Sequence, residues 1–260
     1  MILPDASSDR RTSIHVKPGT YDLTPPWFLH LRQKLTRHRH RRSAKMPDYG
    51  TRTIGGRNVR HVASLGTHCL ASGILKNADL KRYSLPFDWG WATPAMVLHC
   101  LQTDFQDFLP EQAEEDHVLY RRLFGIACVF AHRDIREPLN RAYYERCMNR
   151  MRRLFASDEA KLFLMIARPE TPIGAHFEEI VDQLGRTTSR AELLAIQLQP
   201  PRGNGQSLSL ELVGEHKGSR LYNFRPASKE AGLGYFPDIV DELVVLRLVY
   251  EYAIDLKSAP

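Results

Sequence analysis

The pattern of apolar and polar residues divides the chain into short apolar runs and longer segments with helical spacing. Apolar runs that are almost continuous indicate strands buried on both faces, and they lie at 59–65, 126–131, 162–167 and 192–198. Less continuous runs at 208–213 and 220–224 predict two shorter strands. The spacing of apolar residues between these runs predicts helices that begin near Thr67 and that cover 94–109, 138–156, 177–184 and 237–256.

Strands that alternate with helices favour right-handed crossover connections and a mainly parallel sheet. We therefore predict an α/β fold of three layers, with helices on both faces of a mainly parallel central sheet. The interval between residues 75 and 125 is too long for a simple crossover. It predicts a helical insertion after the first strand–helix unit.

The charge is distributed unevenly along a chain of otherwise ordinary globular composition. Hydrophobic residues make up 43% and charged residues 25%. Residues 1–48 hold ten Lys and Arg residues against four acids, which accounts for the whole formal net charge of +6. We predict that 1–48 is a basic N-terminal arm and that 49–260 is a single α/β domain.

Within the arm, 32–45 contains the run Arg-His-Arg-His-Arg-Arg at 37–42. Clustered cations attract phosphate-rich partners, so a weak anionic partner for 32–45 is one hypothesis. A solvated extension without a partner is the interpretation that we favour, because a single short run is a weak signal.

Other features limit the classes of protein that the chain can belong to. No run approaches the roughly 20 apolar residues of a membrane span, and the N-terminus has no apolar segment typical of a secretory signal. We expect a cytoplasmic protein without a membrane span. No glycine-rich phosphate loop is present, so we expect no cofactor. The four cysteines stand singly, which argues against a disulfide framework or a metal site, and three of them lie in apolar segments that predict burial: Cys100, Cys128 and Cys147.

The fourth cysteine, Cys69, is the best candidate for chemistry. It follows the first predicted strand and lies in the first turn of the next helix. Ligands of open α/β sheets bind beyond the carboxyl ends of the strands. At a helix N-terminus the dipole favours a thiolate, and free backbone N–H groups can hold a developing oxyanion. Cys69 therefore suits a nucleophile better than the other three cysteines.

A second polar group, His132-Arg133-Asp134, follows the predicted strand 126–131. His132 would serve as the general base for Cys69, and Asp134 or Asp88 would orient its imidazole ring. The structural alternatives are a Cys69 that packs under its helix, a His132 that ends a strand and an Asp88 that forms a turn. His68 would either modulate the neighbouring thiol or face solvent.

Several short motifs occur in a recognisable order. They are Ser-Leu-Gly-x-x-Cys at 64–69, Ser-x-Pro-Phe-Asp-Trp at 84–89, His-x-Asp at 132–134 and a strand that ends in Arg168. This order resembles a bacterial domain-of-unknown-function family described as putative papain-like cysteine peptidases. The resemblance implies that Cys69 is the nucleophile, His132 the base and Asp134 the acidic partner. Candidates for holding the substrate or the oxyanion are Ser64, Gly66, Thr67, His68 and Arg168.

The resemblance and the strand pattern disagree about the fold. A papain-like fold joins a helical lobe to an antiparallel barrel, whereas the pattern predicts a parallel sheet. Two functions stay open at this point. One is thiol-dependent hydrolysis of an amide or ester. The other is a non-hydrolytic α/β protein, such as a transferase or its accessory, that binds an anionic sugar, lipid-phosphate or nucleotide through Arg133, Arg168 and Arg225.

Overall fold

The computed structural model describes residues 50–112, 117–126, 128–200, 208–230, 232 and 234–256. The predicted basic arm 1–48, with the hypothesis of an anionic partner for 32–45, lies outside the described residues and stays a prediction.

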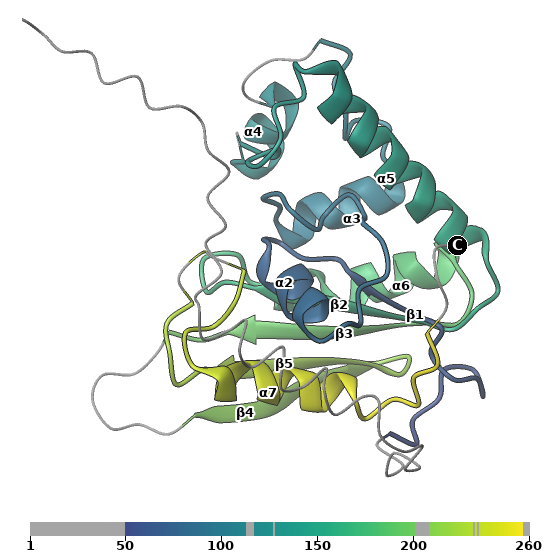
Figure 1. The fold of residues 1–260 in the computed structure, drawn as a ribbon, viewed down its shortest axis with the longest axis vertical. Helices are drawn as coiled ribbons and strands as arrows, with labels where there is room; N and C mark the ends of the chain where they lie inside the picture. The colour runs from purple at the N-terminus through teal and green to yellow at the C-terminus, as the bar shows by residue number, and fades with distance from the viewer. Residues whose placement is uncertain are drawn as a thin grey trace, which may run out of the picture. The chain divides into compact units, whose positions relative to one another are not determined.

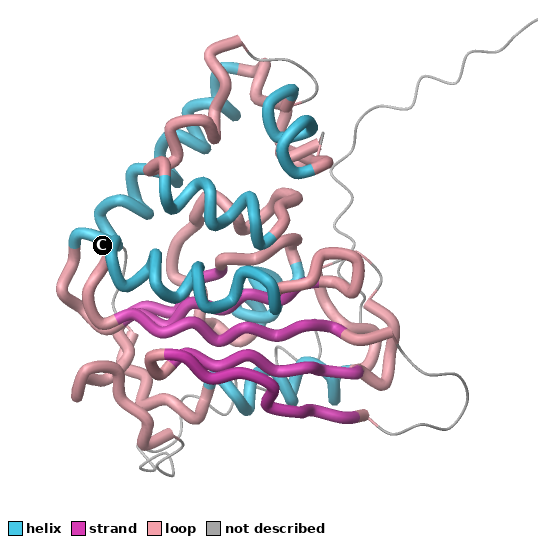
Figure 2. Tube along the Cα trace, turned by 180° about the vertical axis from the view of Figure 1, so that it is seen from behind, coloured by secondary structure: helices cyan, strands magenta, loops and turns pink. Residues whose placement is uncertain are grey.

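A five-stranded sheet forms the centre of the described part of the chain (Figures 1 and 2). Its order is β1-β2-β3-β5-β4. The strands are β1 (His61–Ser64), β2 (Lys161–Ala167), β3 (Ala191–Leu198), β4 (Ser209–His216) and β5 (Ser219–Arg225). Neighbouring strands from β1 to β5 run parallel, and β4 pairs antiparallel with β5. The predicted α/β class with a mainly parallel sheet is confirmed, and it differs from the antiparallel barrel that the papain-like label implies.

The predicted strand at 126–131 is wrong. Its described residues have no strand conformation, and 129–132 form a turn. Of its apolar residues, Val129 is buried by side-chain packing instead of by a strand ladder, Phe130 is half-buried, and Cys128 and Ala131 are exposed. Val129 is 3% exposed, and the ring of Phe130 lies 4.7 Å from that of Tyr144 and 5.4 Å from that of Phe108. A short apolar run indicates burial but does not by itself distinguish a strand from a packed turn.

The helices are α2 (Leu70–Asn77), α3 (Pro94–Gln102), α4 (Val118–Phe124), α5 (Pro138–Ala156), α6 (Phe177–Thr187) and α7 (Ile239–Val249), with a short 3-10 turn at Gly174–His176. The helices other than α4 follow the predicted segments with shifted ends, and α4 had no predicted range of its own. Both α3 and α5 begin with proline, whose fixed φ suits the first helical position. Helices α3 and α4 occupy the long interval after the first strand–helix unit.

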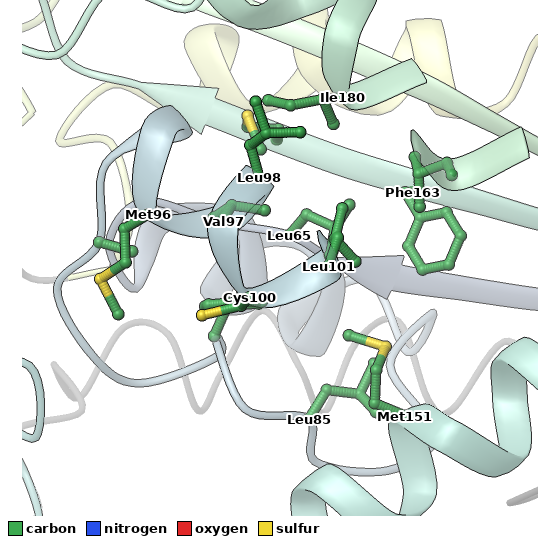
Figure 3. Close-up of a cluster of buried hydrophobic side chains, with 14 of the residues drawn as sticks. Leu65, Leu85, Met96, Val97, Leu98, Cys100, Leu101, Met151, Phe163 and Ile180 are labelled. Atoms are coloured by element: carbon green, nitrogen blue, oxygen red, sulfur yellow. The ribbon is translucent and has the colours of Figure 1, made fainter. Parts of the chain in front are cut away.

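The core lies on both faces of the sheet because β2 is buried along its whole length. Side chains alternate across a strand, so Leu164 packs in one cluster with α2 and α7, while Phe163 packs in another with α3, α5 and α6. Figure 3 shows part of the second cluster, including Cys100 and Met151.

The other cysteines test the burial that the sequence predicts. Cys100 and Cys147 are buried as predicted, but Cys128 is exposed because its segment is not a strand. Among the described residues, no helix has the length and apolar character needed to cross a membrane.

Candidate functional site

The loop between β1 and α2 brings Cys69 to the carboxyl edge of the sheet. The backbone N–H of Gly66 donates to Ser64 Oγ at 3.0 Å, and Thr67 Oγ1 donates to the carbonyl of Ile166 in β2 at 3.0 Å. A Cβ on Gly66 would lie 2.8 Å from the carbonyl oxygen of His68, so this turn requires glycine. Cys69 follows as the N-cap of α2. The predicted position of the cysteine at a helix start is therefore found.

The thiol of Cys69 is covered by a glycine-containing segment from far along the chain. Only 7% of Cys69 is exposed, and Sγ lies 3.9 Å from the carbonyl oxygen of Gly232. A Cβ on Gly234 would lie 3.6 Å from Sγ, and one on Gly73 in α2 would lie 1.8 Å from the Gly234 oxygen. Backbone therefore packs directly on the first turns of α2 and on the thiol.

The electrostatic surroundings hold Cys69 as a thiol rather than as a thiolate. Burial and the negative charge of Glu230 raise its pKa, and the opposing effect of Arg168 is smaller. The sequence led us to expect that the helix N-terminus would favour the thiolate. Desolvation outweighs that effect here, since an exposed charge at a helix end gains only about 0.3–1 kcal/mol.

His68 is buried beside Cys69 with a neutral ring. Its Nδ1 lies 3.2 Å from Thr67 Oγ1, and its Nε2 lies 3.8 Å from Glu230 Oε2. Burial, with a smaller contribution from Arg168, lowers the pKa of His68 to about 3. The approach of His68 to Glu230 is therefore neither an ion pair at neutral pH nor a hydrogen bond, because 3.8 Å exceeds hydrogen-bond distance.

Arg168 directly follows β2 and contacts both Glu230 and Trp91. Its Nε and Nη2 both donate to Glu230 Oε2, at 3.0 and 2.8 Å. Its guanidinium lies 4.5 Å from the centroid of the Trp91 ring, which also stacks on His68 with a centroid distance of 6.2 Å. Glu230 Oε1 accepts the backbone N–H of Gly232 at 2.6 Å. The segment that covers Cys69 is thus fixed to the sheet edge through Arg168.

Two clefts open at this edge of the sheet. The larger, of about 790 Å³, is lined by residues that include Trp91, Arg168, Lys229 and Glu230. The smaller, of about 370 Å³, is lined by residues that include Thr67, His68, Trp91, Cys128 and Arg168. Trp91 and Arg168 line both clefts, so His68 and Glu230 contribute to adjoining parts of one region.

The structure places His132 and Asp134 in a different setting. His132 is exposed in the turn 129–132 and lines a cleft of about 290 Å³ with Arg133 and Arg136. Hydrogen bonds from Arg136, at 2.9 Å, lower the pKa of Asp134. Among the described residues no hydrogen bond joins Cys69 to His132 or His132 to Asp134. The predicted pairing of Cys69 with His132 stays a prediction.

Asp88 lies in the segment that packs against the loop carrying Cys69. It is 1% exposed, forms an ion pair with Lys81 and accepts the backbone N–H of Leu85 at 2.6 Å. Burial raises its pKa, and Lys81 opposes that shift. A little further along this segment, the N–H of Ala92 donates to the Thr67 carbonyl at 2.9 Å. These contacts agree with the interpretation of Asp88 as a turn former that holds the loop carrying Cys69.

The sequence pointed to His68 and Arg168 but missed two residues of the site. Trp91 stands two residues after the Pro-Phe-Asp-Trp motif, so proximity to the motif was a usable signal. Glu230 lies 62 residues from Arg168, its partner, and no local pattern marks it. Among the described residues, no group of three His, Cys, Asp or Glu side chains is placed to hold a metal ion.

Comparison with known families adds one finding to this geometry. Residues 60–117 match the model of the family described as "Putative papain-like cysteine peptidase (DUF1796)". The match confirms the resemblance that the motifs suggested. It covers less than half of the chain: it includes Cys69, Asp88 and Trp91 and ends before His132. The chain has no significant match among curated proteins or among solved structures.

Proposed function

We propose that this protein is a thiol-dependent hydrolase of amides or esters, with the chemistry of a papain-like cysteine peptidase and with Cys69 as its nucleophile. The observation that carries the proposal is the position of Cys69, the N-cap of a helix at the carboxyl edge of a parallel sheet. It adjoins a cleft region lined by His68, Arg168 and Glu230. The match of residues 60–117 to a cysteine peptidase family supports the same residue.

The proposed reaction has two steps. A base takes the thiol proton, Sγ bonds to the carbonyl carbon, and the C–N or C–O bond breaks as the proton passes to the leaving amine or alcohol. Water then attacks the thioester, which releases the acid and restores the thiol. Backbone N–H groups at the start of α2 would stabilise the oxyanion of each step. Because burial and Glu230 raise the pKa of Cys69, the first step depends on that base.

Two histidines are candidates for the base. The sequence and the resemblance favour His132, with Asp134 as its acidic partner, and this role requires the turn 129–132 to approach Cys69. His68 is adjacent to Cys69, but its pKa of about 3 makes it a weak proton acceptor. We therefore assign the base to His132.

The second candidate function is non-hydrolytic binding of an anionic sugar, lipid-phosphate or nucleotide, as in a transferase or its accessory. The observation that favours it is the fork of Arg168, which already holds the carboxylate of Glu230 through two N–H groups. Lys229 lines the same cleft. Guanidinium forks bind carboxylates and phosphates with similar geometry. The raised pKa of Cys69 is also compatible with a cysteine that has no catalytic role.

Hydrolysis of fluorogenic peptide amides and p-nitrophenyl esters distinguishes the two functions. We expect that Cys69→Ser abolishes turnover, whereas Cys147→Ser, the same change at a buried cysteine that lines neither cleft, retains it. His132→Ala should lower kcat at least about 100-fold if His132 is the base, and should leave kcat unchanged if it is not. Turnover that survives Cys69→Ser would overturn the role of Cys69 as the nucleophile. No turnover by the unaltered protein, together with a thermal shift on adding inorganic phosphate, would overturn the hydrolase proposal and favour anion binding.

We also propose a cytoplasmic location. All four cysteines of the chain are free, which fits a reducing compartment. When a cell extract is denatured without a reducing agent, we expect alkylation of all four thiols. A mixed or internal disulfide would count against this location.

A further inference from the structure

The hydrogen bonds of His68 define its tautomer. Thr67 Oγ1 has one proton, and it donates that proton to the Ile166 carbonyl. Its contact with His68 Nδ1, at 3.2 Å, must therefore use an N–H of the ring. The neutral ring carries its proton on Nδ1, so Nε2 presents a lone pair.

The Nε2 lone pair has no hydrogen-bond partner among the described residues, although His68 is 1% exposed. A buried acceptor without a donor is unfavourable, and such groups call for an explanation. The nearby polar atom is Glu230 Oε2, 3.8 Å away. That atom is also an acceptor, so neither group can satisfy the other. One donor placed between them can bond to both.

We propose that His68 Nε2 and Glu230 Oε2 form an acceptor pair that binds the N–H of the substrate, so that the substrate is an amide with a free N–H and not an ester. This inference rests on the proposed hydrolase function. Arg168 fixes the position of Glu230 Oε2 through two charge-assisted hydrogen bonds. An ester oxygen would direct a lone pair at two acceptors, which is repulsive. The acceptor pair therefore favours a substrate that carries an N–H at this position over one that carries an ester oxygen there.

The position of the pair relative to Cys69 fits this role. His68 precedes Cys69 in the chain, and Glu230 is near enough to raise the pKa of the thiol. Glu230 also accepts the N–H of Gly232, whose carbonyl lies 3.9 Å from Sγ. Gly232 thus contacts both the thiol and Glu230, and a substrate amide whose carbonyl carbon meets Sγ, before its C–N bond breaks, would present its own N–H toward this pair.

Two alkylating probes that differ in one group test the inference on Cys69 itself. N-methyl-iodoacetamide carries an N–H where methyl iodoacetate carries an ester oxygen. With each, Sγ displaces iodide, a C–S bond forms, and the thiol proton passes to buffer. Rates are measured in Cys128→Ser protein, because Cys128 lines the smaller cleft, and are divided by the rates for glutathione. We expect Cys69 to prefer the amide by about fivefold to tenfold, and His68→Phe to abolish that preference.

A binding measurement that needs no reactive thiol accompanies the rates. In Cys69→Ser protein with ¹⁵N-labelled histidine, the Nε2 resonance of His68 is assigned by its loss in His68→Phe. N-methylacetamide should shift this resonance to lower frequency, and methyl acetate should not. An Nε2 resonance frequency that neither compound changes would indicate a bound water only and would overturn the acceptor pair.

The combined outcomes separate this inference from the proposed function. An unreactive Cys69 together with an amide-dependent shift would overturn the hydrolase and keep the acceptor pair. A reactive Cys69 with equal normalised rates for both probes, and with no shift, would keep the hydrolase and overturn the acceptor pair.

Discussion

Gly73→Ala tests whether backbone packing on α2 shields Cys69. Relative to glycine, alanine in a helix interior gains about 1 kcal/mol. The added Cβ, however, would lie 1.8 Å from the backbone oxygen of Gly234, far inside contact distance. Overpacking of this kind costs about 1–3 kcal/mol or more. We expect a net loss of about 0–2 kcal/mol or more of unfolding free energy, the difference between these values, together with displacement of the backbone that covers Sγ.

Gly185→Ala in α6 is the matched control. Nothing lies within 4 Å of a Cβ at Gly185, so this change should raise the unfolding free energy by up to about 1 kcal/mol. Urea denaturation followed by circular dichroism measures both variants, and alkylation of Cys69 by iodoacetamide reports its exposure. We expect faster alkylation in Gly73→Ala than in Gly185→Ala. Equal stabilisation by the two substitutions, with unchanged alkylation, would refute the close packing of Gly234 on α2.

Two further predictions concern buried ionisable groups of the site. Asp88→Asn breaks a buried ion pair and leaves the charge of Lys81 without its partner. The urea midpoint should therefore fall by the equivalent of about 3–5 kcal/mol of unfolding free energy. A loss under about 1 kcal/mol would contradict a structural role for this ion pair. For His68 the folded-state pKa of about 3 lies below the unfolded value of about 6.5, so its neutral form favours folding at high pH and stability falls as pH drops through this window. His68→Gln should therefore flatten the dependence of the melting temperature on pH between about 6.5 and 3, and an unchanged slope in that window would exclude a neutral buried His68.

The sequence by itself determined several secondary-structure elements and the position of Cys69 among them. The continuous apolar run at 162–167 predicted a strand covered on both faces, and β2 is buried along its whole length. Pro138 at a helix start fixed the beginning of α5. The polar turn after the first strand predicted that Cys69 would stand at the start of a helix, and it is the N-cap of α2. These features depend on neighbours in the chain, so local patterns record them.

The tertiary structure decided the features that depend on distant contacts. The segment 126–131 is apolar because Val129 and Phe130 pack against other elements, and the same apolar run would suit a strand. The protonation of Cys69 follows from burial and from Glu230, whose position relative to α2 no local spacing encodes. A helix N-terminus favours a thiolate, but the low polarity of the surroundings acts in the opposite direction and is larger. Desolvation arises only when remote backbone covers the thiol, and so it is a property of the folded chain.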